Sequence, residues 1–220
     1  MILERLDPDI ATSYSIRERF TKILRLIKNL VYNVFALFLS RNNENIFIKN
    51  LKARYNFCNN YIDSKIVLDI PCGVGWGTSL LKGYGKLYGI DIDKQAIEKA
   101  KKKYPQIIFK KGSMQNIPFE NEFFDVIICL EGIEHITFIE GQDFLIEVNR
   151  TLKKDGIFII TTPLLLEGKY HSGNKFHLCE YKEEEFLRII KEKYFSILKK
   201  DYINNPRLKI LRLVLKKDSN

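Results

Sequence analysis

Short apolar runs alternate with longer mixed stretches from residue 62 onward. The runs are nearly continuous in apolar residues, which is typical of strands buried on both faces; they cover residues 66–70, 86–90, 107–109, 124–130 and 156–161. The intervening stretches that we read as helices are residues 78–82, 93–103 and 141–152, with Asp93 as an N-cap. Alternation of this kind predicts a parallel sheet with helices on both faces.

The pattern changes after residue 181. A helix is expected over residues 183–193, followed by strands 195–198 and 208–215 joined by Asn204-Asn205-Pro206. So short a connection allows only an antiparallel hairpin. We therefore predict an α/β fold: a doubly wound, mostly parallel, seven-stranded sheet with a C-terminal antiparallel hairpin and extra N-terminal helices.

Two further helices are predicted before the first strand, over residues 16–40 and 44–61. The first places apolar residues at three- and four-residue steps and basic residues opposite them. Its apolar run 30–39 is too short to span a bilayer. It can pack on the core or a second subunit, lie in a membrane interface, or cover a ligand site as a lid. We divide the chain into an N-terminal helical extension (1–61) and a main domain (62–220).

The composition bears on the size of the domain and on its possible binding partners. A chain of 220 residues suits a domain with a sizeable core. Its formal charge of +9 suits a nucleic acid or an anionic membrane surface, although the lysines can equally belong to solvated faces. The four cysteines form no C-x-x-C pair, and the N-terminus does not read as a signal peptide. We expect reduced thiols and a cytoplasmic protein.

The most informative stretch is Ile66 to Leu81, IVLDIPCGVGWGTSLL. A strand, a glycine turn and a helix start are how α/β proteins hold nucleotide-like ligands at the carboxyl edge of the sheet. The third glycine of the dinucleotide fingerprint is replaced by Thr78, so the pattern is G-x-G-x-G. Asp91 ends the second strand about twenty residues later, where a carboxylate can accept hydrogen bonds from ribose hydroxyls. Asp93 is the second candidate for that contact.

An acidic residue, a G-x-G-x-G loop and a second acid together resemble motif I of the class I S-adenosylmethionine-dependent methyltransferases. The resemblance implies a Rossmann-like methyltransferase fold, S-adenosyl-L-methionine as cofactor and methyl transfer. A serine stands where the family has the acid that contacts adenine, so the Met114 backbone or the Gln115 side chain could hold the ring instead. A side chain at Gly75 is expected to occupy cofactor space. The implied cofactor-binding residues are Asp69, Gly73, Gly75, Gly77, Asp91, Ser113, Met114 and Glu131.

Candidate catalytic residues follow two strands. Glu131, Glu134 and His135 come after the strand 124–130, and the long loop 164–181 carries His171 and His177. That loop is long for a structureless connection, which favours substrate binding. Glu134-His135 can start a helix and line the cofactor pocket, or a histidine can act as general base. A divalent metal is the third alternative, since E-x-x-E-H with a later histidine resembles the Hen1-type RNA 2′-O-methyltransferases. We assign catalysis to Glu134, His135 and His177 and leave the metal unassigned.

Several pieces resemble bacterial methyltransferases of surface-polysaccharide and secondary-metabolite clusters. They are Glu4-Arg5-Leu6-Asp7-Pro8, Ala53-Arg54-Tyr55-Asn56-Phe57, Ile133-Glu134-His135 and Gly173-Asn174-Lys175-Phe176-His177. The resemblance implies methyl transfer to a small-molecule or sugar (glycan) acceptor, at a hydroxyl oxygen. The alternatives are a metal-assisted RNA 2′-O-methyltransferase and a non-catalytic scaffold that binds the cofactor.

Overall fold

The computed structural model describes residues 46–165, 174–204 and 209–218. The predicted helix 16–40, the hairpin link at residues 205–206 and His171 lie outside these residues. The fold reported below is that of the compact unit Asn50–Asn220. The division at residues 61 and 62 stays a prediction. In the described part of the chain, no helix combines the length and apolar character needed to cross a membrane.

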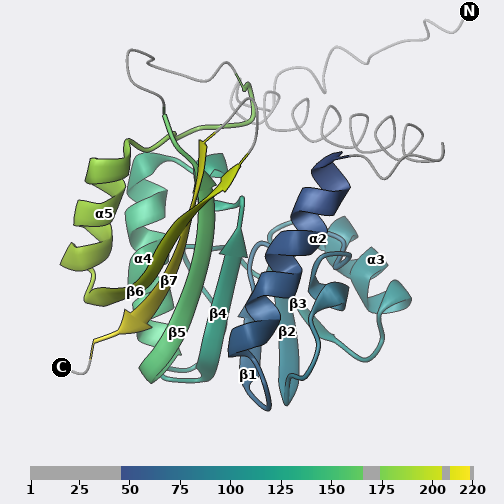
Figure 1. Ribbon diagram of the computed structural model, residues 1–220. Coiled ribbons are helices and arrows are strands. Elements are labelled where there is room, and N and C mark those ends of the chain that lie inside the picture. Colours follow the sequence, from purple (N-terminus) through teal and green to yellow (C-terminus); the bar gives the residue numbers. More distant parts are fainter. Residues whose placement is uncertain (1–45, 166–173, 205–208, 219–220) are drawn as a thin grey trace, which may run out of the picture. The chain divides into compact units, whose positions relative to one another are not determined.

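One seven-stranded sheet with the order β3-β2-β1-β4-β5-β7-β6 forms the centre of the unit (Figure 1). Strands β1 to β5 pair in parallel, while β7 is antiparallel to both β5 and β6. The bounds are β1 Ile66–Asp69, β2 Lys86–Asp91, β3 Ile108–Lys111, β4 Phe124–Leu130, β5 Leu152–Pro163, β6 Phe195–Asn204 and β7 Lys209–Lys217. The predicted fold class is confirmed, including the antiparallel pairing at the C-terminus.

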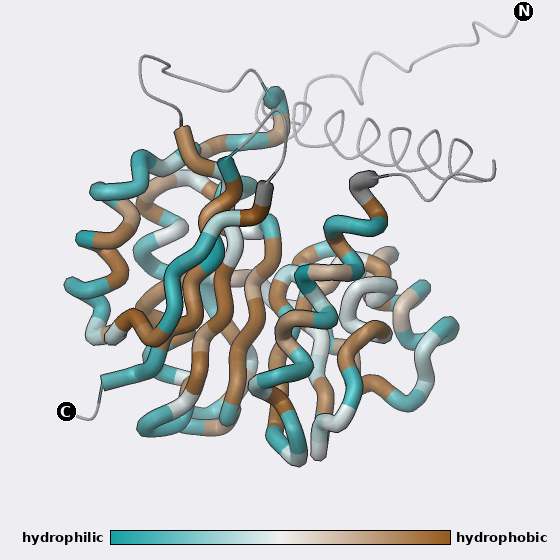
Figure 2. Tube along the Cα trace, viewed as in Figure 1, coloured by the Kyte–Doolittle hydropathy of each residue, from teal (hydrophilic) through white to brown (hydrophobic). Residues whose placement is uncertain are grey.

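Alternate residues of the strands face two separate cores. Leu68 and Ile127 pack in the core that contains apolar residues of α4 (Phe138–Thr151) and α5 (Glu183–Glu192). Their neighbours Val67 and Val126 pack with residues of α2 (Ile46–Cys58) and α3 (Lys94–Lys103). Figure 2 shows hydrophobic positions concentrated along the central strands. Because both faces are covered, these strands are apolar throughout.

The direction of strand order reverses between β1 and β4. From β1 the sheet extends one way through β2 and β3, and the other way through β4 and β5. Connections leave the carboxyl ends of β1 and β4 toward opposite faces, which opens a crevice at that edge of a doubly wound sheet. Both candidate motifs, the glycine loop and Glu131 to His135, follow these two strands.

Most predicted helices are present, with two corrections. Asp93 is the N-cap of α3, as predicted, and accepts hydrogen bonds from the backbone N–H groups of Gln95 and Ala96. The predicted helix 78–82 is only a single 3-10 turn, η2 (Thr78–Leu80). The chain leaves it at Leu81, which is extended and buried, and Gly83 then turns with a positive φ. Burial of Leu81 therefore ends the turn before a helix can grow.

Helix α4 begins three residues before its predicted start, and the reason is local. Thr137 accepts a hydrogen bond from the backbone of Glu140, whose side chain accepts one from the backbone of Thr137. This capping box is a helix-start signal that can be recognised in a sequence. Strand β5 also begins earlier than predicted, at Leu152, because Leu152 pairs with Phe124 beyond an irregularity in the ladder.

Candidate functional site

The glycine loop after β1 is joined to the end of β2 by backbone hydrogen bonds. The Cys72 N–H donates to the Ile90 carbonyl at 2.8 Å, and the Gly73 N–H donates to a carboxylate oxygen of Asp91 at 2.8 Å. The other oxygen of Asp91 accepts from the Asp93 N–H at 2.9 Å. The Asp91 carboxylate is therefore held at the carboxyl edge of the sheet, against the loop. Asp93 uses its own carboxylate to cap α3, which makes it the poorer ligand contact.

The three glycines of the loop have different surroundings. Gly73 has a φ of +54°, and a Cβ built there would meet no atom within 4 Å. A Cβ at Gly75, also at positive φ, would lie 2.6 Å from the Phe109 ring. At Gly77 it would lie 2.2 Å from the Tyr55 ring. Our expectation that a side chain at Gly75 occupies cofactor space is therefore wrong, because that side of the loop packs on β3. Gly73 borders the open space.

Asp69 supports the loop from inside the protein. Its side chain is fully buried and accepts hydrogen bonds from the Thr78 hydroxyl at 2.5 Å and the Tyr55 hydroxyl at 3.2 Å. Burial raises the pKa of Asp69 to about 7; the two hydroxyl hydrogen bonds oppose that rise, and the charge of Asp91 adds to it. Asp69 thus connects β1, α2 and η2 beneath the glycine loop.

Arg54 and Glu131 form a pair whose hydrogen bonding is incomplete. Arg54 comes from α2 and Glu131 follows β4, where it adopts a left-handed φ of +53°. Their nearest charged atoms, Arg54 Nη1 and Glu131 Oε2, lie 3.8 Å apart. Arg54 Nε and Glu131 Oε1 are both buried without a hydrogen-bond partner among the described residues. Buried polar groups of this kind are rare, and the polar groups of a ligand could satisfy both.

Sequence reasoning assigned Glu131 to the cofactor but gave Arg54 no role. The available signal was its position beside Tyr55 on the helix that leads to β1. Tyr55 contacts both Asp69 and Gly77, so the preceding residue of α2 comes close to the same edge. Only the fold shows that this helix lies beside the end of β4.

The segment after β3, where the adenine contact is predicted, folds into a turn. The backbone N–H of Asn116 donates to the Ser113 carbonyl, which makes residues 113–116 a turn. The Met114 side chain is buried in the core. Its backbone, rather than its thioether, is thus what the turn can offer to a ligand. The predicted roles of Ser113 and Met114 at an adenine ring stay predictions.

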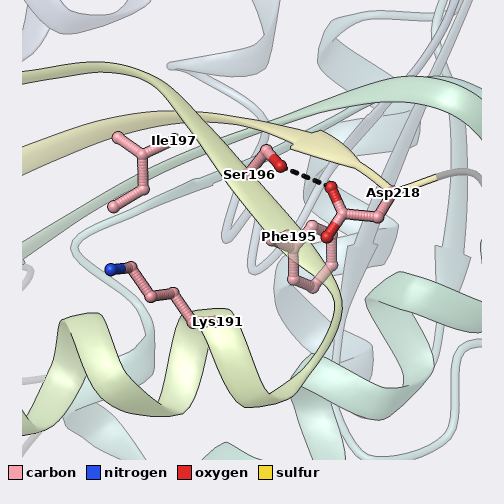
Figure 3. A pocket seen from close by; sticks show the side chains of 5 residues that line it. All are labelled: Lys191, Phe195, Ser196, Ile197 and Asp218. Carbon is pink, nitrogen blue, oxygen red and sulfur yellow. Dashed lines mark hydrogen bonds between the residues drawn. The ribbon is translucent and has the colours of Figure 1, made fainter.

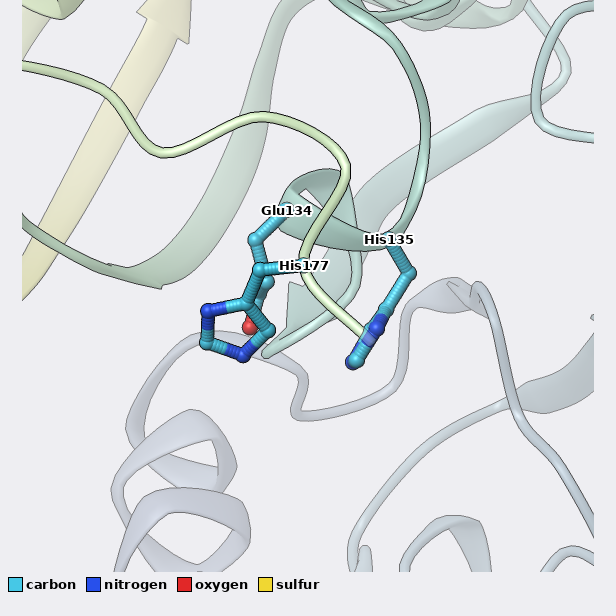
Figure 4. A group of neighbouring side chains, drawn as sticks. All are labelled: Glu134, His135 and His177. Atoms are coloured by element: carbon cyan, nitrogen blue, oxygen red, sulfur yellow. The ribbon is translucent and has the colours of Figure 1, made fainter. Parts of the chain in front are cut away.

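The second motif folds into η3 (Ile133–His135), directly after β4 (Figure 4). Glu134 is only 1% exposed, and its carboxylate accepts a hydrogen bond from the Thr162 hydroxyl of β5 at 3.3 Å. Burial, followed by the negative charge of Glu131, raises the pKa of Glu134 well above its ordinary value. A buried carboxylate is thereby placed at the carboxyl ends of β4 and β5.

The structure brings His177 to the same place. The backbone N–H groups of Leu178 and Cys179 both donate to the Glu134 carbonyl, at 2.8 and 3.2 Å, and so attach the distant loop to η3. The rings of His135 and His177 are 5.4 Å apart between centroids. One ligand atom from each of Glu134, His135 and His177 lies within 4.8 Å of the others. All three side chains extend to the same side of η3 in Figure 4.

A different hollow lies at the opposite edge of the sheet (Figure 3). It is lined by Lys191, Phe195, Ser196, Ile197 and Asp218, from the end of α5, the start of β6 and the residue after β7. Phe195 pairs with Lys217, and Lys216 pairs with Ile157 near the start of β5. This hollow is therefore remote from the carboxyl ends of the parallel strands, and we do not include it in the site.

Comparisons with known proteins agree with this geometry. Residues 68–160 match the family model described as "Methyltransferase domain". A probable S-adenosylmethionine-dependent methyltransferase from Mycolicibacterium smegmatis is 23% identical over 158 residues, which is 70% of this chain and 61% of that protein. The ubiquinone/menaquinone biosynthesis C-methyltransferase UbiE from Campylobacter jejuni is 34% identical over 102 residues, 43% of each chain. This chain therefore spans less than two thirds of either relative.

Residues 68–160 are thus similar to a methyltransferase domain. Solved structures support the fold: the PH0226 protein from Pyrococcus horikoshii superposes with a TM-score of 0.66 at 21% identity, covering 80% of this chain and 93% of that one. A geranyl diphosphate methyltransferase in complex with GPP and sinefungin superposes with a TM-score of 0.65 at 12% identity, covering 75% and 78%. The family match and the S-adenosylmethionine-dependent relative indicate S-adenosylmethionine as the cofactor of this domain.

The residues at the carboxyl edge fit that cofactor. Gly73 leaves open space at the loop, and the Asp91 carboxylate lies beside it, where a carboxylate can accept hydrogen bonds from ribose hydroxyls. Arg54 and Glu131 carry opposite charges and each has a buried polar atom to satisfy. An amino acid group has a carboxylate and an ammonium, which match an arginine and a glutamate in that order.

Proposed function

We propose that this chain transfers the methyl group of S-adenosylmethionine to a hydroxyl oxygen of a small molecule or sugar. The observation that carries the proposal is the position of Glu134, His135 and His177. Glu134 and His135 follow the same strand as Glu131, and His177 joins them from the loop after β5, so polar side chains gather beside the proposed cofactor residues. A site for methyl transfer needs a recess for the cofactor and, next to it, groups that align an acceptor.

In this proposal each part of the cofactor has its own residues. Asp91 binds the ribose hydroxyls. Gly73 has no side chain on its open side, so the ligand can lie close to the backbone of the loop. Arg54 binds the carboxylate of the methionine part and Glu131 binds its ammonium. The turn at Ser113 and Met114 holds the adenine ring. Bound in this way, the cofactor supplies an electrophilic methyl group.

A hydroxyl acceptor loses a proton when its oxygen attacks the methyl group. The imidazoles of His135 and His177 are the groups best placed to receive it. The Nδ1–H of His177 donates to the Glu180 carboxylate at 2.6 Å, and both side chains are almost fully buried. A carboxylate in this position orients the imidazole and fixes its tautomer, so the pair has the form of a general base with its positioning acid.

The relatives support methyl transfer and bear on the acceptor in different ways. The mycolicibacterial relative is described only by its cofactor, whereas the Campylobacter protein is a C-methyltransferase. The structural neighbour that binds GPP acts on a small molecule. Proton-accepting imidazoles favour an oxygen acceptor in this chain. A small molecule or glycan is the proposed partner, and RNA is the alternative that the positive charge would suit.

The test combines binding and turnover. S-adenosylhomocysteine is titrated by calorimetry, and methyl-tritiated S-adenosylmethionine is then offered with panels of phenols, nucleotide sugars, glycans and RNA. Mass spectrometry locates the methyl group on the product. We expect O-methylation, lost at least 100-fold in His177→Gln with unchanged cofactor affinity. A methyl group on carbon would contradict the hydroxyl acceptor, and cofactor binding without turnover on any panel would favour the scaffold.

A further inference from the structure

Three side chains at the end of β4 form a set of metal-ligand type. Glu134 offers a carboxylate, His135 and His177 offer imidazoles, and the ligand atoms lie within 4.8 Å of one another. Glu134 and His177 are buried, whereas His135 is exposed. Two imidazoles and one carboxylate are a ligand set for divalent ions of the first transition row, with positions left for water or substrate.

The surroundings of both imidazoles orient them as ligands. The Nδ1–H of His135 donates to the Phe176 carbonyl at 2.9 Å, and the Nδ1–H of His177 donates to Glu180 at 2.6 Å. A carbonyl or carboxylate partner at Nδ1 places the ring proton there and the lone pair on Nε2. Metal-binding histidines in proteins characteristically have such a partner on the second nitrogen.

The two acidic residues after β4 favour a bound cation, whereas the loop of His177 makes one contact that the cation would have to replace. Glu131 and Glu134 place two acidic groups in the short segment after β4, where two carboxylates would repel each other. A divalent cation offsets that repulsion. The Asn174 amide, which donates to His177 Nε2 at 2.7 Å, would have to move aside. Asn174 is exposed, so the exchange costs a hydrogen bond at the surface.

We propose that Glu134, His135 and His177 bind a divalent transition-metal ion that coordinates the acceptor oxygen. The role of the ion rests on the proposed hydroxyl acceptor, whereas its binding does not. The coordinated hydroxyl releases its proton to water, and its oxygen then forms the new C–O bond. The C–S bond breaks with its electron pair remaining on sulfur, which leaves S-adenosylhomocysteine. With the ion bound, the imidazoles act as ligands and water receives the proton, which replaces the direct proton transfer to an imidazole described under the proposed function.

The first experiment is a titration of the metal-stripped full chain with Co²⁺, followed by its visible d–d absorption and by calorimetry. We expect one bound ion per chain, with absorption typical of nitrogen and oxygen ligands. Mg²⁺ at the same concentration is expected not to compete, because it prefers oxygen ligands, whereas Zn²⁺ displaces Co²⁺. Absence of a Co²⁺ complex, or sulfur-to-metal charge transfer from a cysteine, would overturn the site.

Variants locate the ion. Glu134→Gln, His135→Gln and His177→Gln are each expected to lower Co²⁺ affinity at least 100-fold. Glu180→Gln, which alters only the partner of His177, is expected to lower it about tenfold. Glu98→Gln on α3 is the matched control, since it removes an exposed carboxylate paired with Lys101. Unchanged Co²⁺ affinity in the two histidine variants would contradict the proposal.

Binding of S-adenosylhomocysteine is measured on the same samples. Intact cofactor binding without Co²⁺ binding would remove the metal and leave the proposed function standing. Co²⁺ binding without any hydroxyl methylation would remove the acceptor class and leave the metal site standing. Full turnover in the presence of a strong chelator, with metal-free protein verified by elemental analysis, would show that the imidazoles receive the proton directly.

Discussion

Two groups of carboxylates have opposite surroundings: those at the carboxyl edge of the parallel strands, which we call the cofactor edge, and those around the C-terminal hairpin. Around β6 and β7 the acids are paired with cations: Glu183 accepts from Lys200 and Lys209, and Arg212 donates twice to Asp201 at 2.7 and 2.6 Å. Glu183 also accepts from the Tyr202 hydroxyl. Hydrogen bonds to Glu183, with the largest contribution from Tyr202, lower the pKa of its carboxyl group to about 2. At the cofactor edge, burial instead raises the pKa values of Asp69 and Glu134.

The difference separates polar groups that satisfy one another from polar groups that a ligand could satisfy. In the hairpin, acids and bases satisfy one another at the surface, and exposed pairs of that type contribute little free energy each. At the cofactor edge, buried polar atoms of Arg54 and Glu131 have no partner among the described residues, and Glu131 adopts a left-handed φ. Such features lower stability, and proteins concentrate them at sites where a ligand completes the interactions.

The largest expected effect is on Asp91. Asp91→Ala removes the acceptor for the ribose hydroxyls and the anchor of the Gly73 N–H, so S-adenosylhomocysteine affinity should fall about 100-fold or more. Asp93→Ala is the matched control: it removes the α3 cap and about 1 kcal/mol of stability, with affinity nearly unchanged. Calorimetry and urea unfolding measure the two quantities. Equal affinity losses in both variants would argue against the assignment of Asp91.

The next effect concerns Arg54. Arg54→Met keeps the volume but removes the charge that we assign to the methionine carboxylate, so S-adenosylhomocysteine affinity should fall roughly tenfold. Binding of 5′-methylthioadenosine, which lacks the amino acid part, should be unchanged. Arg188→Met on α5 serves as the control at an exposed position. A similar loss for both ligands would mean that Arg54 acts through the fold.

The smallest expected effect is on stability as a function of pH. The raised pKa of Asp69 means that the folded state retains a proton that the unfolded state has released. Its contribution is complete below the unfolded pKa near 4 and is lost as pH rises through about 7. The free energy of unfolding should thus decline between pH 5 and 7, by about 1 kcal/mol per pH unit at most. Urea unfolding across this range measures the slope.

Two variants test the source of that slope. Asp69→Asn should flatten it, and Glu134→Gln should remove part of what remains, because the pKa of Glu134 is shifted in the same direction. Arg212→Met should leave the slope intact and instead reduce the loss of stability below pH 4, where Asp201, whose pKa is lowered by Arg212, becomes protonated. A slope that persists in both carboxylate variants would contradict this assignment.

Strands were predicted more reliably than their ends and the short helices. A strand buried on both faces requires a continuous apolar run. The run 124–130 coincides with β4 because a central strand of the sheet buries nearly all of these residues. The start of α4 depends on a capping box that our prediction did not use. The helix expected after the glycine loop is only one turn long, because the burial of Leu81 outweighs the local preference for a helix.

By itself the sequence determined the order of strands and helices, and it predicted the glycine-loop motif and the role of Asp91, because these depend on apolar periodicity and local spacing. Only the tertiary structure decided which side of each glycine is open, and that Gly75 packs on Phe109. It also decided that Arg54 meets Glu131 and that His177 joins Glu134 and His135. These contacts join residues of different elements that have no local pattern in common, so only the packing of helices and loops around the sheet brings them together.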